Sequence, residues 1–261
     1  MTALRETFNQ DAERYDRARP RYPPELVAEL ARAAGLGPHS RVLEIAPGTG
    51  QLTVPLAESG CHVTAVELGD AMARVARRRL ARFPRVEVRV AEFESWPLPD
   101  EPFDLVVCAT AFHWLDPAVR VVKPARALRP GGRLALVLTE HVAGGTEEFF
   151  ARVQRCYERW DPATPPGLRL QPASEIPTGS AELEDSPLFE QVTVARRTQD
   201  ITYSTDEYID ILLTYSNHRA LPPASRQGLL TCVRELIDTG YDGSVTKRYL
   251  HELVVATRVA G

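Results

Sequence analysis

Short apolar runs alternate with amphipathic segments through the first half of the chain. Five runs of aliphatic and β-branched residues predict strands, near 41–46, 62–67, 86–91, 103–109 and 133–138. Apolar residues at helical spacing predict helices at 25–34, 51–59, 70–82 and 117–128. Strands and helices that alternate at this spacing indicate βαβ units with right-handed crossovers. The pattern therefore predicts an α/β fold, with a doubly wound and mostly parallel sheet.

Local signals refine the boundaries of these elements. Asp70 and Asp116 stand where N-cap residues are preferred. Pro55 and Pro124 fall inside predicted helices, so we expect a kink or a shifted boundary at each. Pro-Gly-Gly at 130–132 predicts a turn that leads into the fifth strand.

The pattern changes after Leu138. A helix is predicted at 147–160, followed by a stretch rich in proline that extends to Pro177. Two further strands are predicted, about 189–199 and 245–258, and between them two helices, at 205–217 and 224–238. We expect the last two strands to pair as an antiparallel edge of the main sheet, and the helices to form a cap insertion.

The N-terminal segment is polar and aromatic. Prolines at 20, 23 and 24 oppose a helix, so an extended lid is predicted for the first 24 residues. The expected organisation is a lid and helix over 1–36, a ligand-binding core over 37–140, and a cap with the last two core strands over 141–261.

Composition narrows the class of protein. The 261 residues suffice for one large α/β domain with a cap, and 44% hydrophobic and 25% charged residues are typical of a globular protein in water. A net charge of -4 without a basic tail argues against nucleic-acid binding. No segment reaches 18 apolar residues, and the N-terminus has no signal-like apolar core, so no membrane association and a cytoplasmic location are expected.

Cysteine and histidine give no sign of a metal site. The cysteines at 61, 108, 156 and 232 are far apart, and the six histidines show no ligand spacing. Cys108 lies within an apolar strand, which predicts a reduced, buried thiol. We expect a reducing compartment and no metal.

The strongest chemical signal lies between the first two strands. Val42 to Ala46 is an apolar strand that leads into Gly48 and Gly50, and Glu67 ends the next strand. Glycine permits a close approach of the backbone to a ligand, and a carboxylate one strand away suits a ribose diol. A Gly-x-Gly turn alone also fits a plain strand-to-helix connection, but Glu67 at the correct strand end favours a nucleotide-like ligand.

The order of the motifs over roughly residues 8–140 resembles the class I S-adenosylmethionine (SAM)-dependent methyltransferases, which have a Rossmann-like fold. The motifs are Leu43–Gly50, Val63–Glu67, Ala91–Phe93, Phe103–Ala109 and Leu128–Gly132. Phe112-His113-Trp114 narrows the resemblance to the small-molecule branch of trans-aconitate methyltransferase-like proteins, with a methyltransferase type 11 domain. Ala46 and Glu92 depart from this pattern, which more often has glycine and aspartate there.

The resemblance implies SAM as cofactor, with S-adenosylhomocysteine as product. Glu44 would organise contacts near the amino group, Glu67 would bind the ribose, and Leu68 and Met72 would flank the adenine. Arg19 is also placed to pair with the methionyl carboxylate, although a solvent-facing helix arm fits it equally well. The full implied cofactor set is Tyr15, Arg19, Tyr22, Glu44, Ala46, Gly48, Gly50, Glu67, Leu68, Met72, Glu92, Phe93, Ala109 and Thr110.

The resemblance places His113 near the transferring methyl group. It is the candidate catalytic residue, as general base or as substrate orienter, and a packed structural imidazole is equally compatible. Substrate contacts are expected from Trp114 and, in the cap, from Tyr215, His218 and Arg219. The partner is then a small-molecule acceptor with an oxygen, nitrogen or carbon nucleophile, on a natural product or a carboxylate, and the chain is a monomer or homodimer.

Two other functions stay open at this point. A nicotinamide-dependent oxidoreductase uses a similar sheet, but its third glycine is replaced here by Thr53 and no Tyr-x-x-x-Lys dyad is found. A non-catalytic SAM-binding protein would retain the glycine turn without turnover. The predicted class is a methyltransferase of EC group 2.1.1.

Overall fold

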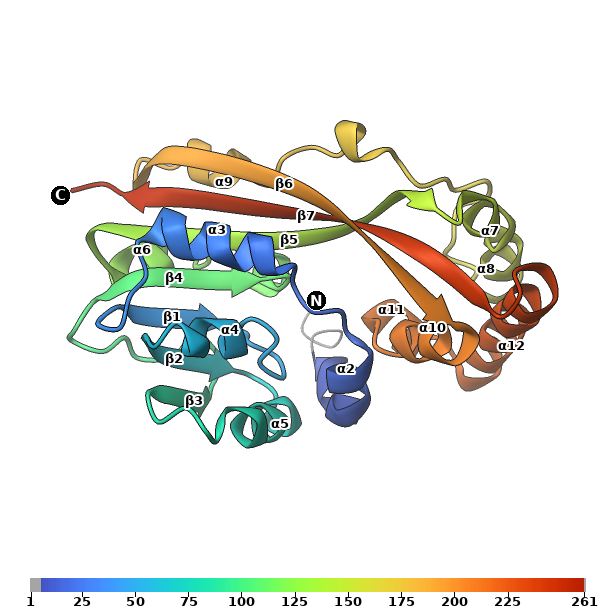
Figure 1. Ribbon diagram of the computed structural model, residues 1–261, viewed down its shortest axis with the longest axis horizontal. Helices are drawn as coiled ribbons and strands as arrows, with labels where there is room; N and C mark the ends of the chain where they lie inside the picture. Colours follow the sequence, from blue (N-terminus) through green and yellow to red (C-terminus); the bar gives the residue numbers. More distant parts are fainter. Residues whose placement is uncertain (1–5, 261) are drawn as a thin grey trace. The chain divides into compact units, whose positions relative to one another are not determined.

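The computed structural model describes residues 6–260, with side chains from residue 9 onward. The described chain, drawn as a ribbon in Figure 1, divides into two compact units. Each unit has its own hydrophobic core. Unit 1 comprises residues 6–19, 140–177 and 198–250, and unit 2 comprises residues 20–139, 178–197 and 251–260.

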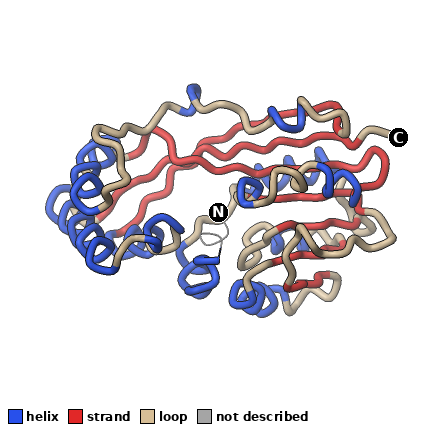
Figure 2. The backbone as a smooth tube through the Cα atoms, turned by 180° about the vertical axis from the view of Figure 1, so that it is seen from behind, coloured by secondary structure: helices blue, strands red, loops and turns tan. Residues whose placement is uncertain are grey.

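A seven-stranded sheet has the order β3-β2-β1-β4-β5-β7-β6. Its strands are the red segments of the backbone in Figure 2. Its strands are β1 (Arg41–Ile45), β2 (His62–Glu67), β3 (Val86–Val90), β4 (Phe103–Ala109), β5 (Leu128–Gly145), β6 (Phe189–Ser204) and β7 (Ser244–Arg258). The first five strands pair in parallel. The predicted fold class, a Rossmann-like and mostly parallel sheet, is confirmed.

The last two strands run antiparallel to their neighbours. Side-chain hydrogen bonds join Thr202 to Thr246, and Thr257 to Gln191, so β6 and β7 run in opposite directions. Thr139 of β5 bonds His251 of β7. The antiparallel edge is confirmed. Strands β5 and β6 are longer than predicted, whereas β7 lies within one residue of its predicted bounds.

The core of unit 2 has a layer of side chains on each face of its strands. On one face, Val42 and Val63 pack with α3 (Pro24–Ala34), α4 (Thr53–Glu58) and α5 (Asp70–Leu80). On the other face, Leu43 and Val106 pack with α6 (Val122–Ala127) and α9 (Ala181–Glu184). Residues adjacent in a strand face opposite layers, so both faces are apolar, as the continuous apolar runs predicted.

Proline sets two helix boundaries in unit 2. Pro55 and Pro124 each occupy the third position of a helix, where no intrahelical N–H bond is lost. Helix α6 consequently begins at Val122 rather than at residue 117, and Asp116 instead caps a preceding turn by accepting from the Ala118 N–H. The expectation of shifted boundaries is confirmed.

The Pro-Gly-Gly segment lies inside β5 rather than before it. Phe103 pairs with Leu128 and Leu105 pairs with Arg133, so residues 129–132 bulge from the ladder. A Cβ atom at Gly132 would lie 2.9 Å from the Arg129 carbonyl oxygen. Glycine permits this close approach. Because the strand continues through the bulge, β5 begins at Leu128, before the turn that was predicted to precede it.

Unit 1 has a separate core rich in aromatic residues. Phe149, Tyr208 and Val233 are buried in it. Its helices are α2 (Ala12–Ala18), α7 (Glu147–Arg152), α8 (Gln154–Trp160), α10 (Thr205–Leu212), α11 (Ser216–Ala220) and α12 (Pro223–Gly240), with 3-10 turns at Glu6–Asp11 and Ala173–Glu175. The helix predicted at 147–160 is interrupted at Val153, and the one predicted at 205–217 ends at Leu212.

The prediction of an extended N-terminal lid is wrong for residues 6–18, which are helical. The Asp11 side chain caps α2 by accepting from the Arg14 N–H. The chain becomes extended only from Arg19 to Pro23, where the prolines act. Residues 1–5 of the predicted lid lie outside the described residues.

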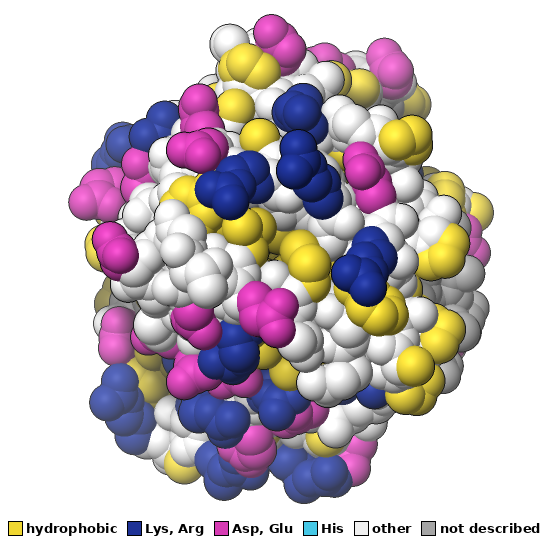
Figure 3. Space-filling model, turned by 90° about the vertical axis from the view of Figure 1, so that its right-hand side faces the viewer, with side chains coloured by type: hydrophobic (Ala, Val, Ile, Leu, Met, Phe, Trp, Pro, Cys, Tyr) yellow, Lys and Arg dark blue, Asp and Glu magenta, His cyan; other side chains and the backbone are white. Residues whose placement is uncertain are grey.

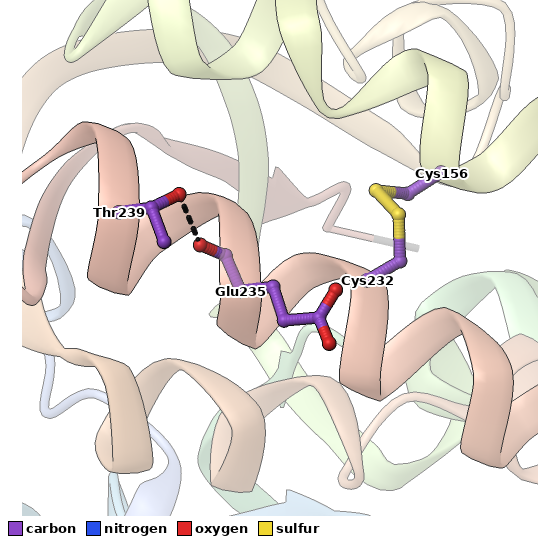
Figure 4. The surroundings of a disulfide bond; sticks show 4 residues. All are labelled: Cys156, Cys232, Glu235 and Thr239. Atoms are coloured by element: carbon purple, nitrogen blue, oxygen red, sulfur yellow. Dashed lines mark hydrogen bonds between the residues drawn. A yellow bond between two sulfur atoms is a disulfide. The ribbon is translucent and has the colours of Figure 1, made fainter.

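A disulfide bond joins Cys156 of α8 to Cys232 of α12 within unit 1 (Figure 4). The two cysteines are 76 residues apart, so their pairing was not visible from sequence spacing. Cys61 and Cys108 are free and buried, as expected for Cys108. Disulfide bonds are rare in reducing compartments, so this pair departs from the reducing environment that we expected. Over residues 6–260, no helix is both long and apolar enough to span a bilayer.

Candidate active site

The residues of the glycine turn and the acidic strand end meet at one edge of unit 2. Strands β1, β2, β3 and β4 are parallel neighbours, so their carboxyl ends lie side by side. Ala46, Leu68, Ala91 and Thr110 follow directly or closely after these strand ends. The structure therefore gathers the predicted cofactor residues of unit 2 along this edge.

The backbone is strained where the two central strands end. Ala46 after β1 has φ of 53°, and Thr110 after β4 also has φ of 53°. Side chains disfavour this left-handed region, which costs about 1–2 kcal/mol per residue. Gly48 and Gly50 have φ of 62° and 91°, and there glycine removes the penalty. Strain at two adjacent strand ends is typical of a functional edge.

Glu67 holds the turn in place. One carboxylate oxygen accepts the Gly48 N–H at 3.0 Å, and the other accepts the Gly69 N–H at 2.7 Å. Burial raises the pKa of Glu67 to about 7, and these backbone donors oppose the rise. Because each carboxylate oxygen has two acceptor sites, Glu67 retains capacity for a ligand hydroxyl.

Glu44 is buried near the carboxyl end of β1 and has one hydrogen-bonding atom without a partner among the described residues. Its side chain is 1% exposed, and among the described residues its Oε2 has no hydrogen-bond partner. Burial raises the pKa of Glu44 to about 8, the Thr53 hydroxyl opposes this rise, and the nearby charge of Glu67 adds to it. An unsatisfied buried carboxylate oxygen calls for a donor from a ligand or water.

The predicted adenine residues differ in exposure. Leu68 is exposed and Met72 is buried at the start of α5. Glu92 is partly buried, and Phe93 packs in the core with Leu43. The side chain of Phe93 is therefore structural, and only its backbone is left for the predicted contact.

Tyr22, which precedes α3, contacts the residue that follows the end of β4. Its hydroxyl lies 3.1 Å from the Thr110 hydroxyl, and its ring meets the His251 ring edge-on. Thr110 also donates to the carbonyl oxygen of Ala109. Tyr22, Ala109 and Thr110 thus form one contact group, as the predicted cofactor set requires.

His113 lies in a 3-10 turn (Phe112–Trp114) just after β4. Its ring is exposed on one side and packs against Trp114, with centroids 4.7 Å apart. Partial burial and the positive charge of Arg120 lower the pKa of His113. The imidazole is therefore neutral at pH 7, the form that accepts a proton.

The other predicted residues lie in unit 1. Arg19 lies over the rings of Tyr15 and Tyr215, 4.8 Å from each centroid. His218 is buried and bonded to the Tyr157 hydroxyl at 2.9 Å, and burial lowers the pKa of His218 to about 4.

Arg219 is anchored within unit 1 rather than free to meet a ligand. It donates to the carbonyl oxygen of Leu213 and lies 3.7 Å from the Asp11 carboxylate. His218 and Arg219 therefore have structural partners, whereas Tyr215 contacts two cations.

Sequence reasoning missed Lys247. This residue is 4% exposed in β7, and its Nζ bonds the Tyr215 hydroxyl at 2.7 Å. A signal was present, because Lys247 is one of only two lysines in the chain and lies within a predicted strand. As to metals, no group of three His, Cys, Asp or Glu side chains among the described residues could hold an ion.

Part of the chain is similar to known methyltransferases. Residues 43–136 match the family model of the methyltransferase domain. An uncharacterized methyltransferase of Mycobacterium tuberculosis is 42% identical over 131 residues, which cover 50% of this chain and 51% of the relative. The match with this relative thus spans about half of its length.

Solved structures extend the similarity of the fold to most of the chain. A candidate type II methyltransferase from Anaeromyxobacter dehalogenans has a TM-score of 0.60 and 23% identity, and covers 92% of this chain and 97% of its own. A second match is phosphoethanolamine N-methyltransferase 2 of Haemonchus contortus, in complex with phosphomonomethylethanolamine and S-adenosylhomocysteine. It has a TM-score of 0.51 and 19% identity, and the match covers 90% of this chain and 52% of that protein. At these identities the two matches show a shared fold alone.

Proposed function

We propose that the chain binds SAM at the edge of unit 2 and transfers its methyl group to a small-molecule acceptor. The unpaired Oε2 of buried Glu44 carries this proposal, because it suits a cationic donor such as an α-ammonium group. It lies in β1, in register with Ala65 of β2, the strand that Glu67 ends. Two acidic groups beside a glycine turn fit an amino acid joined to a ribose.

The residues present fit this cofactor. Glu67 would accept the ribose hydroxyls, Gly48 and Gly50 would allow close backbone approach, and Leu68 and Met72 would flank the adenine. When bound, SAM supplies a methyl group on an activated sulfonium. The protein then has to orient the acceptor and to manage its proton.

His113 is the residue proposed to take that proton. It follows the end of β4, and its pKa is lowered, so the neutral ring is available at pH 7. An acceptor that is already ionised would need only orientation by His113 and Trp114. The narrower assignment to a trans-aconitate methyltransferase-like branch stays a prediction, based on the Phe112–Trp114 motif.

Isothermal titration with SAM tests the proposed cofactor. Glu67→Ala is expected to weaken SAM binding by about 1–3 kcal/mol, because charged hydrogen bonds are lost. Glu87→Ala is the matched control, since Glu87 is an exposed carboxylate on the neighbouring strand β3. Tight binding of NAD without binding of SAM would refute the proposal, as would an unchanged SAM affinity in Glu67→Ala.

A further inference from the structure

Unit 1 contains a cluster of aromatic rings around two cations, Lys247 and Arg19. The Lys247 ammonium lies 4.9 Å from the ring centroids of both Tyr215 and Tyr249. The Arg19 guanidinium lies 4.8 Å from the centroid of the same Tyr215 ring. A second tyrosine pair adjoins them, because the Tyr203 hydroxyl is 3.0 Å from the Tyr249 hydroxyl.

The two cations have no acidic partner within reach. Among the described residues, no carboxylate lies within 4.0 Å of the Lys247 ammonium or the Arg19 guanidinium. Lys247 bonds only the Tyr215 hydroxyl, and Arg19 donates through one terminal nitrogen to the Thr214 carbonyl oxygen. The Arg19 Nε is buried and without a hydrogen-bond partner in the same part of the chain.

A buried cation without a counter-charge is expensive to maintain. Buried lysine is rare unless it is paired, and removing it from water costs several kcal/mol. A desolvated cation–π contact returns on the order of 2 kcal/mol, which offsets only part of this cost. Ionisation of Tyr215 would balance one of the two charges, and the other would remain. The arrangement thus lowers stability unless something outside the described chain supplies negative charge.

The neighbouring groups respond to this excess positive charge. Burial alone would raise the pKa of Tyr215, but the charges of Lys247 and Arg19 outweigh it and lower that pKa. Burial lowers the pKa of His141 to about 2, and Lys247 adds to this effect. His141 is therefore neutral and gives no further charge, and its Nε2 is another buried atom without a partner among the described residues.

The surface of unit 1 has a different character. On the face that carries α7, α8 and α12, basic and acidic side chains are interspersed (Figure 3). The unbalanced positive charge is therefore a feature of the interior cluster. Lys247 is buried, whereas Tyr215 and Arg19 are partly exposed and give the cluster access to solvent.

We propose that this cluster binds the oxyanion of a small ligand, a carboxylate or phosphate group, between the Lys247 ammonium and the Arg19 Nε–H. The Tyr215 and Tyr249 hydroxyls would supply further hydrogen bonds. If the proposed methyltransferase function holds, the acceptor belongs to the class of small organic anions. This last step rests on the proposed function, but anion binding by unit 1 does not.

Calorimetric titration of the full chain with inorganic phosphate and, separately, with succinate tests the site. Wild type should bind at least one probe, and the preferred probe distinguishes a phosphate from a carboxylate ligand. Lys247→Met should weaken that binding about tenfold to a hundredfold, since a hydrogen bond to a charged group is lost. Arg248→Met is the matched control, because Arg248 is on the same strand as Lys247 but is paired with Asp200 of β6. Its affinity should stay within twofold of wild type.

Stability gives a second reading. Lys247→Met should fold and raise the urea midpoint in the absence of anion, since it removes an unpaired buried charge. Tyr215→Phe keeps both cations and should retain anion binding within about tenfold of wild type. This variant tests the site if Lys247→Met fails to fold. The proposal is overturned if neither probe binds, or if Lys247→Met and Arg248→Met bind alike. SAM titration of the same variants separates the two proposals: normal SAM binding without anion binding refutes only the anion site.

Discussion

Replacement of Glu44 by glutamine should make the protein more stable at alkaline pH and a poorer binder of SAM. Glu44→Gln keeps the size of the side chain and removes its charge. In the folded protein, burial raises the pKa of Glu44 from the ordinary 4.5 to about 8. The folded state therefore holds this proton more tightly than the unfolded state.

The sign of the pH dependence follows from this difference. Below pH 4.5 the carboxyl is protonated in both states and costs nothing. Between pH 4.5 and 8 the unfolded state ionises first, so stability falls as pH rises. A pKa difference of one corresponds to 1.36 kcal/mol, so the full penalty above pH 8 is on the order of 5 kcal/mol. The buried amide of glutamine has unmet hydrogen bonds of its own, which cost about 1–3 kcal/mol and offset part of the gain in stability.

Urea denaturation at pH 5 and pH 8.5 measures the effect. Glu44→Gln should gain about 2–4 kcal/mol over wild type at pH 8.5, and at pH 5 it should gain nothing or lose up to about 2 kcal/mol, because the cost of the amide remains there. Glu252→Gln is the control, because Glu252 is equally buried but has partners: Arg196 Nε at 2.5 Å and the Gly179 N–H at 2.6 Å. That variant should lose stability at both pH values, since it breaks a buried ion pair.

Titration with SAM completes the test of Glu44. If the unpaired oxygen meets the cofactor's ammonium group, Glu44→Gln should weaken SAM binding by about 1.5–3 kcal/mol. The reasoning about burial fails if Glu44→Gln is no more stable than wild type at pH 8.5. The cofactor role fails if its SAM affinity is unchanged.

Three further results are expected. Ala46→Gly should raise the urea midpoint by the equivalent of about 0.5–1 kcal/mol, because relief of the left-handed strain exceeds the entropy lost by glycine; a lower midpoint would contradict this. Reduction of the Cys156–Cys232 bond, which closes a loop of 76 residues, should lower the free energy of unfolding by about 4 kcal/mol. Dithiothreitol should therefore lower the urea midpoint of wild type, and it should leave the midpoint of a variant with serine at both positions unchanged. His113→Gln should reduce turnover and keep the SAM affinity within about twofold of wild type. Wild-type turnover should rise with pH, with a midpoint below 6.5, as His113 loses its proton. An identical pH profile in the variant would exclude the base role.

Much of unit 2 was predictable because its signals are local. Strands β1 to β4 and helices α3 and α5 lie within a few residues of the predicted positions. Apolar periodicity marks such elements directly, and parallel order then places the ends of β1 and β2 side by side. The turn at Gly48 and the position of Glu67 beside it followed from these two facts.

Unit 1 was less predictable because it depends on contacts distant in sequence. Proline correctly marked an extended Arg19–Pro23, but nothing local signalled the helix at Ala12–Ala18 that docks near Asp210 through Arg14. The pairing of Cys156 with Cys232 required α8 and α12 to pack together first.

The sequence by itself determined the parallel sheet, the glycine turn and the acidic strand end, since each depends on residue type and on spacing over a few positions. Only the tertiary structure decided which charges are left unpaired. Glu44 looks like any acidic residue in a strand, and Lys247 like any lysine, until the burial of both is known. The physical reason is that the energy of a charge depends on the solvent and partners around it, and distant parts of the chain supply these.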